Sequence, residues 1–370
     1  MEILAYCETL KAIRRDLHKQ PEIGFNLPNT TAYLIKVLRE AGFIPRELAG
    51  GLVVDIGERS DKVLLRADMD ALPVTDGKHV SYGSHNQGAC HACGHDAHMA
   101  MLIGAALLLK ERGLSARLIF QPAEECPPGG ALGMIEAGVL AGVSAAFALH
   151  LAPFLPSGAV GVKGGMVMAS ADNFTITVRG VGGHGAMPHT TVDAILAGAH
   201  VVTGLQALVS RQNDPLEPLV VTIGKIQGGT VCNVIADAVR LEGTVRTINE
   251  QLRQQMPSRI EATATNISKA FGAECHVTYN WGYPALKNNV EMAGKVSQVA
   301  AKNANQVVHM ERPMMGGEDF AYFLEKVPGA FVFLGTGSEK HPHQLHHPCF
   351  DFNEEILPVG AKLLADLAQI

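Results

Sequence analysis

The sequence predicts an α/β protein with a mostly parallel sheet, into which a smaller α+β domain is inserted. Two observations lead to this prediction: β-rich and helical runs alternate along the first 168 residues, and strands with one solvated face follow from there. The length of 370 residues agrees with two domains, because one hydrophobic core seldom serves a chain of that size. We therefore expect a larger domain of residues 1–168 and 283–370, interrupted by a second domain of residues 169–282.

The larger domain is expected to alternate short β-rich strands with apolar helices. Gly113 ends the clearest of these helices, whose apolar residues recur with helical spacing. The expected elements are, in order, an amphipathic helix at 1–22, strands at 51–57 and 62–68, a helix at 97–113, a strand with a polar turn at 116–125, a helix at 129–140 and a buried strand at 145–153. This alternation is typical of a largely parallel sheet.

The inserted domain is expected to follow the order β-α-β-β-α-β. Its first strand lies in 173–183, where polar and apolar residues alternate with period two. The remaining elements are a helix at 191–212, strands at 217–229 and 238–247, a helix at 249–272 and a strand at 274–283. This order is that of a ferredoxin-like split unit. A helix from about Asn288 and a strand at 330–337 then belong to the larger domain again.

The charge and the apolar content of the chain argue against several classes of protein. The net charge is −6 and no lysine- or arginine-rich block occurs, so we expect no nucleic-acid partner and no anionic membrane surface. The longest weakly polar stretch, 137–155, is interrupted by Ser144 and His150, so we expect no membrane span. The N-terminal stretch lacks a basic head followed by an apolar run, so we expect no secretory signal and a cytoplasmic location.

Nine residues, Cys90 to His98, contain two cysteines, three histidines and an aspartate. Three interpretations compete: a redox pair of Cys90 and Cys93, a structural zinc site, or part of a catalytic metal site. The seven cysteines are too few, and odd in number, for a disulfide scaffold, and the context of a thioredoxin-like Cys-x-x-Cys is missing. Gly94 lets the backbone turn tightly between Cys93 and His95, so that both side chains can face one ion.

Further metal-binding residue types follow the predicted strands. In a parallel α/β sheet, ligands bind beyond the carboxyl ends of the strands. The carboxylates and imidazoles at these ends are Asp68, Asp70, Glu124, Glu125, His150, His341, His343, His346 and His347. A structural zinc site takes its ligands from a short span, whereas these candidates are spread over roughly 250 residues. The dispersal favours a catalytic site that the fold assembles.

Each of these residues also has a purely structural interpretation. Asp68 and Asp70 suit a cap at a strand end, and two adjacent glutamates suit a solvated turn. A single histidine such as His150 in an apolar run is more often a hydrogen-bonded core residue than a ligand. His184 lies in a glycine-rich stretch, 179–189, that could serve only as a strand-to-helix turn. The combination of these residues, rather than any one of them, favours a metal site.

Eight motifs occur in the order seen in metal-dependent amidohydrolases. They lie at residues 14–25, 64–73, 91–109, 121–125, 181–189, 232–247, 316–323 and 345–355. With these motifs the sequence resembles the aminoacylase and carboxypeptidase-like superfamily, in the branch of hippurate hydrolases and indole-acetyl-amino-acid hydrolases. The resemblance covers nearly the whole chain. It implies a catalytic domain with a di-metal peptidase-like fold and an inserted ferredoxin-like lid domain, through which two copies would form a homodimer.

The resemblance also implies a reaction, a cofactor and a ligand set. The reaction is hydrolysis of the amide bond of a small N-acyl amino acid, a hippurate-like or N-acetyl compound, which releases a carboxylic acid and a free amino acid. The cofactor is a pair of divalent ions, Zn, Mn, Co or Ni. The residues at the metal-ligand positions of the family are Cys93, His95, Glu125, His150 and His346.

Five other residues would serve catalysis and substrate binding. Glu124 falls at the position of the general base, and His184 at that of a histidine that reaches the catalytic site, often from the partner subunit. Asn233 and Arg246 match positions that contact substrate. The Asp70 carboxylate would orient a metal-binding histidine.

The sequence departs from the family pattern at Cys90, His347 and Cys349. These departures leave the shape of the acyl pocket open, and Cys90 could make the site prone to oxidation. Three other functions stay open: deacetylation of N-acetyl-diaminopimelate, hydrolysis of dipeptides, and a catalytically inactive role as a metal-binding interaction protein. The intact Glu124 and the complete ligand set argue against the last of these.

Overall fold

The structure, a computed structural model, describes residues 3–370, and the chain divides into two compact units. The first unit comprises Met1–Val167, Lys287–Arg312 and Asp319–Ile370, and the second comprises Met168–Leu286 and Pro313–Glu318. The main difference from the predicted boundaries concerns residues 313–318, which we expected in the larger domain. They group with the second unit because the Ala169 N–H donates to the carbonyl oxygens of Met314 and Gly316, at 3.0 Å each.

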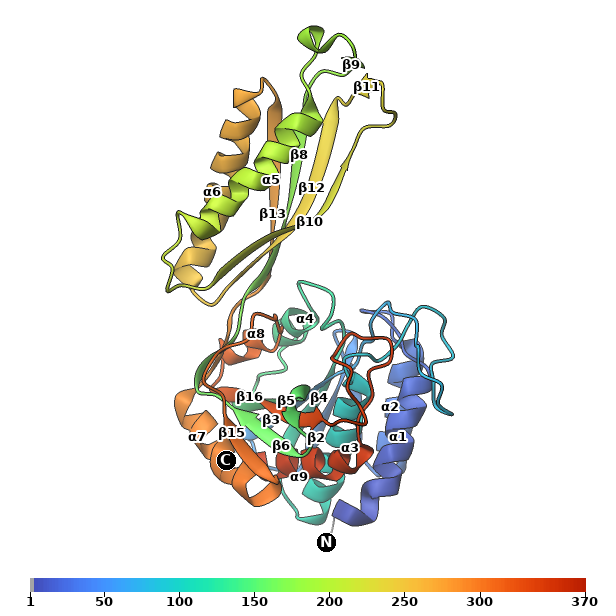
Figure 1. The fold of residues 1–370 in the computed structure, drawn as a ribbon. Coiled ribbons are helices and arrows are strands. Elements are labelled where there is room, and N and C mark those ends of the chain that lie inside the picture. Colours follow the sequence, from blue (N-terminus) through green and yellow to red (C-terminus); the bar gives the residue numbers. More distant parts are fainter. Residues whose placement is uncertain (1–2) are drawn as a thin grey trace. The chain divides into compact units, whose positions relative to one another are not determined.

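The first unit is built on a mixed sheet of eight strands (Figure 1). In spatial order the strands are β1 (Arg46–Leu48), β2 (Gly51–Ile56), β4 (Ala116–Gln121), β3 (Lys62–Asp68), β5 (Val143–Pro156), β16 (Gly329–Gly337), β6 (Ala159–Val162) and β15 (Gln306–His309). The central strands β4, β3, β5 and β16 are parallel, whereas β2 and β6 are antiparallel to β4 and β16. The predicted α/β class with a mostly parallel sheet is confirmed.

Helices surround this sheet in the first unit (Figure 1). They are α1 (Cys7–Lys19), α2 (Pro28–Glu40), α3 (His95–Glu111), α4 (Ala131–Glu136), α7 (Val290–Asn303), α8 (Ala321–Leu324) and α9 (Leu357–Leu367), with 3₁₀ turns at Ile3–Tyr6 and Glu354–Ile356. α3 is buried on nearly all sides because it packs against α1, α9 and β3, so its apolar residues form no single stripe. The helix predicted at 1–22 is shorter, and residues 1–2 lie outside the described part of the chain.

Two element boundaries differ from expectation close to the predicted metal ligands. α3 begins at His95, two residues earlier than predicted. β5 continues to Pro156, because its last residues pair with β16 as far as Gly337, so the prediction that His150 ends its strand is wrong. The register of β3 against β5, with Arg66 opposite Ala148, nevertheless brings the end of β3 level with the middle of β5.

The second unit is an antiparallel sheet with two helices on one face (Figure 1). The elements follow the predicted order: β8 (Ala171–Arg179), α5 (Ala194–Ser210), β10 (Leu219–Gly228), β12 (Ala238–Thr247), α6 (Glu250–Ala270) and β13 (Glu274–Tyr283). The strands are arranged β10-β12-β8-β13, the arrangement of a ferredoxin-like unit. Smaller elements are the ribbon of β9 (Gly183–His184) and β11 (Val234–Ile235), a 3₁₀ turn at Pro188–Thr190, and the pair of β7 (Gly165–Met168) and β14 (Leu286–Asn288).

The longer helices are α3 and α5, with 17 residues each, and α6, with 21. A bilayer crossing takes about 20 predominantly apolar residues. Within residues 3–370, none of the helices combines that length with that apolar character.

Candidate metal centre

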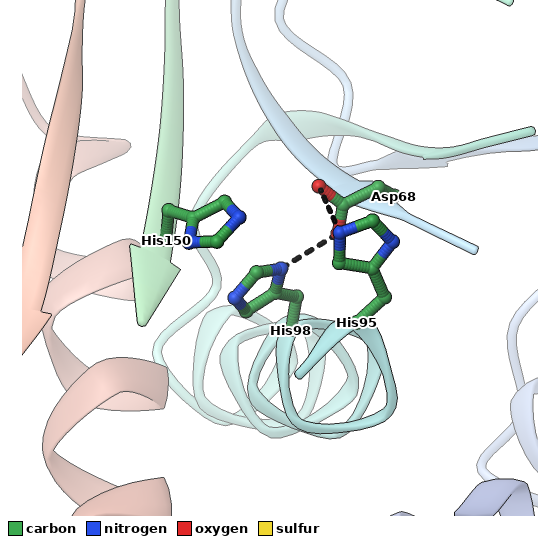
Figure 2. Close-up of side chains that lie close together, drawn as sticks. All are labelled: Asp68, His95, His98 and His150. Atoms are coloured by element: carbon green, nitrogen blue, oxygen red, sulfur yellow. Dashed lines mark hydrogen bonds and ion pairs between the residues drawn. The ribbon is translucent and has the colours of Figure 1, made fainter. Parts of the chain in front are cut away.

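Four side chains converge where β3 ends (Figure 2). Asp68 is the last residue of β3, His95 and His98 lie in the first turn of α3, and His150 extends from β5. One carboxylate oxygen of Asp68 is 2.6 Å from Nδ1 of His98, and the other is 3.6 Å from Nε2 of His95. Each of the four residues offers one ligand atom within 4.8 Å of the other three, a spacing that suits a metal site.

A second group of three side chains adjoins the first. The ligand atoms of Cys93, Glu125 and His346 lie within 4.8 Å of one another, and Nε2 of His346 is 3.3 Å from Oε1 of Glu125. Sγ of Cys93 is 3.4 Å from Nε2 of His150, and Oε1 of Glu125 is 3.9 Å from Nε2 of His95. The fold therefore brings together all five residues that the resemblance places at ligand positions.

A local turn holds His346 beside this group. Its φ of +67° is in the left-handed region, which is uncommon for a residue with a Cβ. Its N–H donates to the carbonyl oxygen of Ala92 at 2.8 Å. Because Ala92 precedes Cys93, this bond fastens the segment after β16 to the segment that carries Cys93.

Backbone carbonyls fix the tautomers of two of the histidines. Nδ1 of His95 donates to the carbonyl oxygen of Asp70, and Nδ1 of His150 donates to that of Leu151, at 2.8 Å in both cases. In each ring the lone pair therefore resides on Nε2, the nitrogen that lies near the other donor atoms. Burial lowers the pKa of His150 to about 3, which keeps this imidazole neutral.

Divalent metal ions fit this set of donors. Nε2 of His95 and Oε1 of Glu125 are buried without a hydrogen-bond partner among the described residues, which costs free energy unless an ion satisfies them. Burial raises the pKa of the Cys93 thiol, and the carboxylates of Glu125 and Glu124 raise it further, so a thiolate at this position needs a cation beside it. Thiolate, imidazole and carboxylate together suit zinc, and also manganese, cobalt or nickel.

Asp70 contacts the centre in a different way from the one expected. Its backbone carbonyl, rather than its carboxylate, accepts the His95 hydrogen bond; the nearer carboxylate oxygen is 3.8 Å from Nδ1. The carboxylate instead accepts the N–H groups of Glu124 at 2.8 Å and Glu125 at 3.1 Å. Burial raises the pKa of Asp70 to about 6. Asp70 thus fixes the backbone of both glutamates.

The sequence places Asp68 at a strand end but not in the ligand set, and it assigns His98 no separate role, yet both residues are buried in the centre. Burial alone would raise the pKa of Asp68, but His95, Arg66 and His98 hold it well below its usual range. Arg66 donates to Asp68 at 2.6 Å and to Asp319 at 2.8 Å. A sequence signal for His98 existed, since it lies three residues after His95 and so shares its helix face. The contact of Arg66 with Asp319, by contrast, joins segments too far apart in the chain to be predicted from spacing.

The second unit carries the other predicted residues. β9 pairs with β11, which places His184 opposite Val234, and the Gly185 N–H donates to the carbonyl oxygen of Asn233 at 2.9 Å. His184 and Asn233 are exposed and lie in the same small ribbon. Arg246 is half-buried near the end of β12, where its guanidinium donates to the Val245 carbonyl oxygen at 3.1 Å.

Cys90 is buried apart from the two groups of ligand atoms. Its Sγ is 3.9 Å from Nε2 of His18 and 3.6 Å from Nζ of Lys78. Both Cys90 and Cys93 are free thiols in this structure.

Residues 64–370 match the model of Peptidase family M20/M25/M40. The chain is 40% identical over 376 residues to the N-acetylcysteine deacetylase of Bacillus subtilis (strain 168), a match that covers 99% of this chain and 97% of that protein. It is also 37% identical over 366 residues to the N-acetyldiaminopimelate deacetylase of Brevibacillus brevis, with 95% of each chain covered.

The fold is similar to solved structures as well. The crystal structure of the Bacillus subtilis YXEP protein, described as a dinuclear metal-binding peptidase of the M20 family, superposes with a TM-score of 0.84. The two sequences are 38% identical, and the match covers 98% of both chains. These relatives do not single out the hippurate hydrolase branch. This chain belongs to peptidase family M20/M25/M40, a family of metal-dependent hydrolases.

Proposed function

We propose that this protein hydrolyses the amide bond of small N-acyl amino acids, hippurate-like or N-acetyl compounds, and releases a carboxylic acid and a free amino acid. The relative that is named a deacetylase of N-acetylcysteine supports this class of substrate. The observation that carries the proposal is the convergence of five donor residues with buried, unpartnered ligand atoms among them: Cys93, His95, Glu125, His150 and His346.

Two divalent ions are the proposed cofactor, with these five residues as ligands. Such ions polarise a substrate carbonyl and lower the pKa of a nearby water molecule when bound. The two adjacent glutamates then have different roles. Glu125, whose carboxylate lies beside both Cys93 and His346, is the proposed ligand. Glu124 also has a carboxylate oxygen within 4.8 Å of ligand atoms of His95 and Glu125, and it is the proposed proton carrier at the edge of the metal pair.

Glu124 acts in turn as general base and general acid. Its carboxylate accepts a proton from the attacking water and delivers it to the amide nitrogen as the C–N bond breaks. The side chain suits this role because its backbone is fixed by Asp70 and only 6% of the residue is exposed. Proton transfer of this kind contributes about 10²- to 10⁴-fold to the rate.

His184 is the proposed donor to the oxyanion that forms on the substrate carbonyl. Its Nδ1 accepts the N–H of Ala186 at 3.0 Å, so the ring proton of the neutral imidazole resides on Nε2. An exposed Nε2–H of this kind can donate to an atom outside its own chain segment. The loss of one such donor costs roughly 3 kcal/mol of transition-state stabilisation.

The dimensions of the second unit support a partner subunit as the source of His184. The ribbon with His184 and Asn233 adjoins the start of β12 at Ala238, whereas Arg246 lies eight residues further along this strand. At about 3.3 Å per residue, these groups are roughly 25 Å apart. A small acyl amino acid cannot contact both in one chain. We therefore propose a homodimer in which each site takes Arg246 from one chain and His184 and Asn233 from the partner subunit.

Deacetylation of N-acetyl-diaminopimelate is a second candidate function. It is favoured by the 37% identity to a relative that is named for this activity. Both reactions break the same kind of amide bond, so the proposed roles of Glu124 and His184 would be unchanged.

A panel of substrates tests these proposals. The protein, loaded with Zn²⁺ or Mn²⁺, is incubated with hippurate, N-acetyl amino acids, N-acetyl-diaminopimelate and dipeptides, with and without a chelator. We expect free amino acid to be released from the acyl amino acids, the chelator to abolish the release, and added metal to restore it. Hydrolysis of N-acetyl-diaminopimelate alone would assign the second function. Hydrolysis of none of these compounds would contradict both functions and favour a non-catalytic metal-binding role.

A further inference from the structure

Three more metal-binding side chains lie close together in the segment that follows β16. They are His343, His347 and Cys349, and each offers one ligand atom within 4.8 Å of the other two. None of them belongs to the group of Cys93, Glu125 and His346. Two of the three, His347 and Cys349, are positions at which the sequence departs from the family pattern.

The two imidazole rings are arranged face to face. Their centroids are 4.0 Å apart and their planes differ by 6°. Because the lone pair of an imidazole nitrogen lies in the ring plane, one ring must rotate about its side-chain bonds for both rings to bind the same ion. A neutral imidazole is the form that binds metal ions.

Cys349 lies on the side of His347 where a lone pair is available. The backbone N–H of Cys349 donates to Nδ1 of His347 at 3.0 Å, so this nitrogen carries a lone pair. Sγ of Cys349 is 3.4 Å from the carbonyl oxygen of Gly77. The ring of His343 forms no hydrogen bond with any residue in 3–370. All three side chains are half-buried or exposed, so an ion can reach them from solvent.

We propose that His343, His347 and Cys349 bind a third metal ion, a thiophilic divalent cation such as Zn²⁺, separate from the catalytic pair. Two imidazoles and one thiolate are preferred zinc donors, and water fills the fourth position of such a three-residue site. If Nδ1 of His347 is the ligand atom, binding replaces its hydrogen bond from the Cys349 N–H with a metal–nitrogen bond, and the thiol proton of Cys349 is released to solvent.

The position of this site couples it to the catalytic ligands. His347 directly follows His346, and the Gly77 N–H donates to the carbonyl oxygen of Pro348 at 3.0 Å. An ion bound to His343, His347 and Cys349 therefore cross-links the segment that carries His346 and restrains this catalytic ligand.

Zinc stoichiometry tests the proposal without any measurement of activity. Wild-type protein, His343→Ala and Cys349→Ser are dialysed against a buffer of fixed free zinc, and the zinc content per chain is measured. His341→Ala, in the same segment, and Cys232→Ser, an exposed free cysteine, are matched controls. We expect three ions per chain in the wild type and both controls, and the loss of one ion in the two test variants. The two ions that remain show that these variants are folded.

Cobalt substitution gives a second readout of the same site. Co²⁺ bound to a thiolate has a charge-transfer absorption in the near ultraviolet. We expect Cys349→Ser to lose about half of this band, since Cys93 supplies the other half, and Cys232→Ser to keep all of it. Two zinc ions in the wild type, or three retained in both test variants, would overturn the proposal. Loss of every ion in both test variants would also overturn it, because these residues would then serve the fold rather than a third ion.

Discussion

His18 has an unusual charge for a buried histidine. Its Nδ1 is 2.6 Å from Asp96, the residue after His95, and its Nε2 is 3.3 Å from Asp76. Burial alone would lower the pKa of His18, but Asp96, with help from Asp76 and Cys90, raises it to about 10. Arg14 also donates to Asp96, at 2.8 Å. His18 is therefore a buried cation that holds the start of α3.

A raised pKa in the folded state makes stability depend on pH with a defined sign. His18 contributes to the free energy of unfolding. This contribution is fully present below about pH 6.5, the pKa of the histidine in the unfolded chain, and it is lost as the pH rises through about 10, its pKa in the folded protein. Urea unfolding of wild type and His18→Gln measures it. We expect the wild type to be more stable by a few kcal/mol at pH 6.5, with this advantage shrinking toward pH 10, since one pKa unit corresponds to about 1.4 kcal/mol.

His79→Gln, a change on the exposed surface, is the control for this measurement. A difference between wild type and His18→Gln that stays constant from pH 6.5 to pH 10 would mean that His18 is not a buried cation.

At the scale of elements, α3 carries His95 and His98 and depends on close packing behind them. A Cβ atom at Gly104 would lie 2.7 Å from Cβ of Ala361 in α9 and 3.1 Å from the side chain of Leu10 in α1. Real Cβ atoms almost never approach so closely, so these helices can pack at this distance only because residue 104 is glycine. The packing of α1 and α9 therefore determines where the first turn of α3 lies.

A matched pair of glycine substitutions tests this packing. Gly104→Ala should lower the free energy of unfolding by roughly 1–3 kcal/mol, because the added methyl group forces backbone shifts. Gly294→Ala, within α7, adds the same group where nothing lies within 4 Å, and should raise stability by up to about 1 kcal/mol. Chemical denaturation of both variants measures the two effects. Equal effects would show that α3 is not tightly packed at Gly104.

The elements were predicted well where local patterns define them, and less well where distant contacts do. The β-α-β-β-α-β order of the second unit was predicted from the period-two first strand and from the order of the β-rich and helical runs that follow it. The end of β5 was wrong because pairing with β16 extends that strand past His150. The five proposed ligand residues were identified from motifs, and the fold brings them together. The Asp68–His98 contact, by contrast, depends on the register of β3 and the position of α3. Charged residues are usually exposed, so the sequence does not indicate that a cation such as Arg14 is buried.

For the whole molecule, the proposed dimer predicts complementation between two inactive variants. His184→Ala and Glu124→Gln chains are each expected to be nearly inactive. When they are mixed under conditions that exchange subunits, half of the dimers are hybrids, and each hybrid has one site with an intact Glu124 and an intact partner His184. We expect recovery of about a quarter of the wild-type activity. No recovery, despite hybrids detected by mass spectrometry, would mean that His184 does not act in the partner's site.

The central claim is that residues distant in the chain hold a pair of metal ions, and that a carboxylate beside this pair does not bind metal. Two variants, Glu124→Gln and Glu125→Gln, test it when their metal content and turnover are measured side by side. Glu124→Gln should keep the wild-type metal content and lose about 10²- to 10⁴-fold in turnover, the usual contribution of a general base. Glu125→Gln should lose at least one ion, because the amide is a much weaker ligand than the carboxylate. Metal loss from Glu124→Gln with full retention by Glu125→Gln, or wild-type turnover by Glu124→Gln, would contradict the claim.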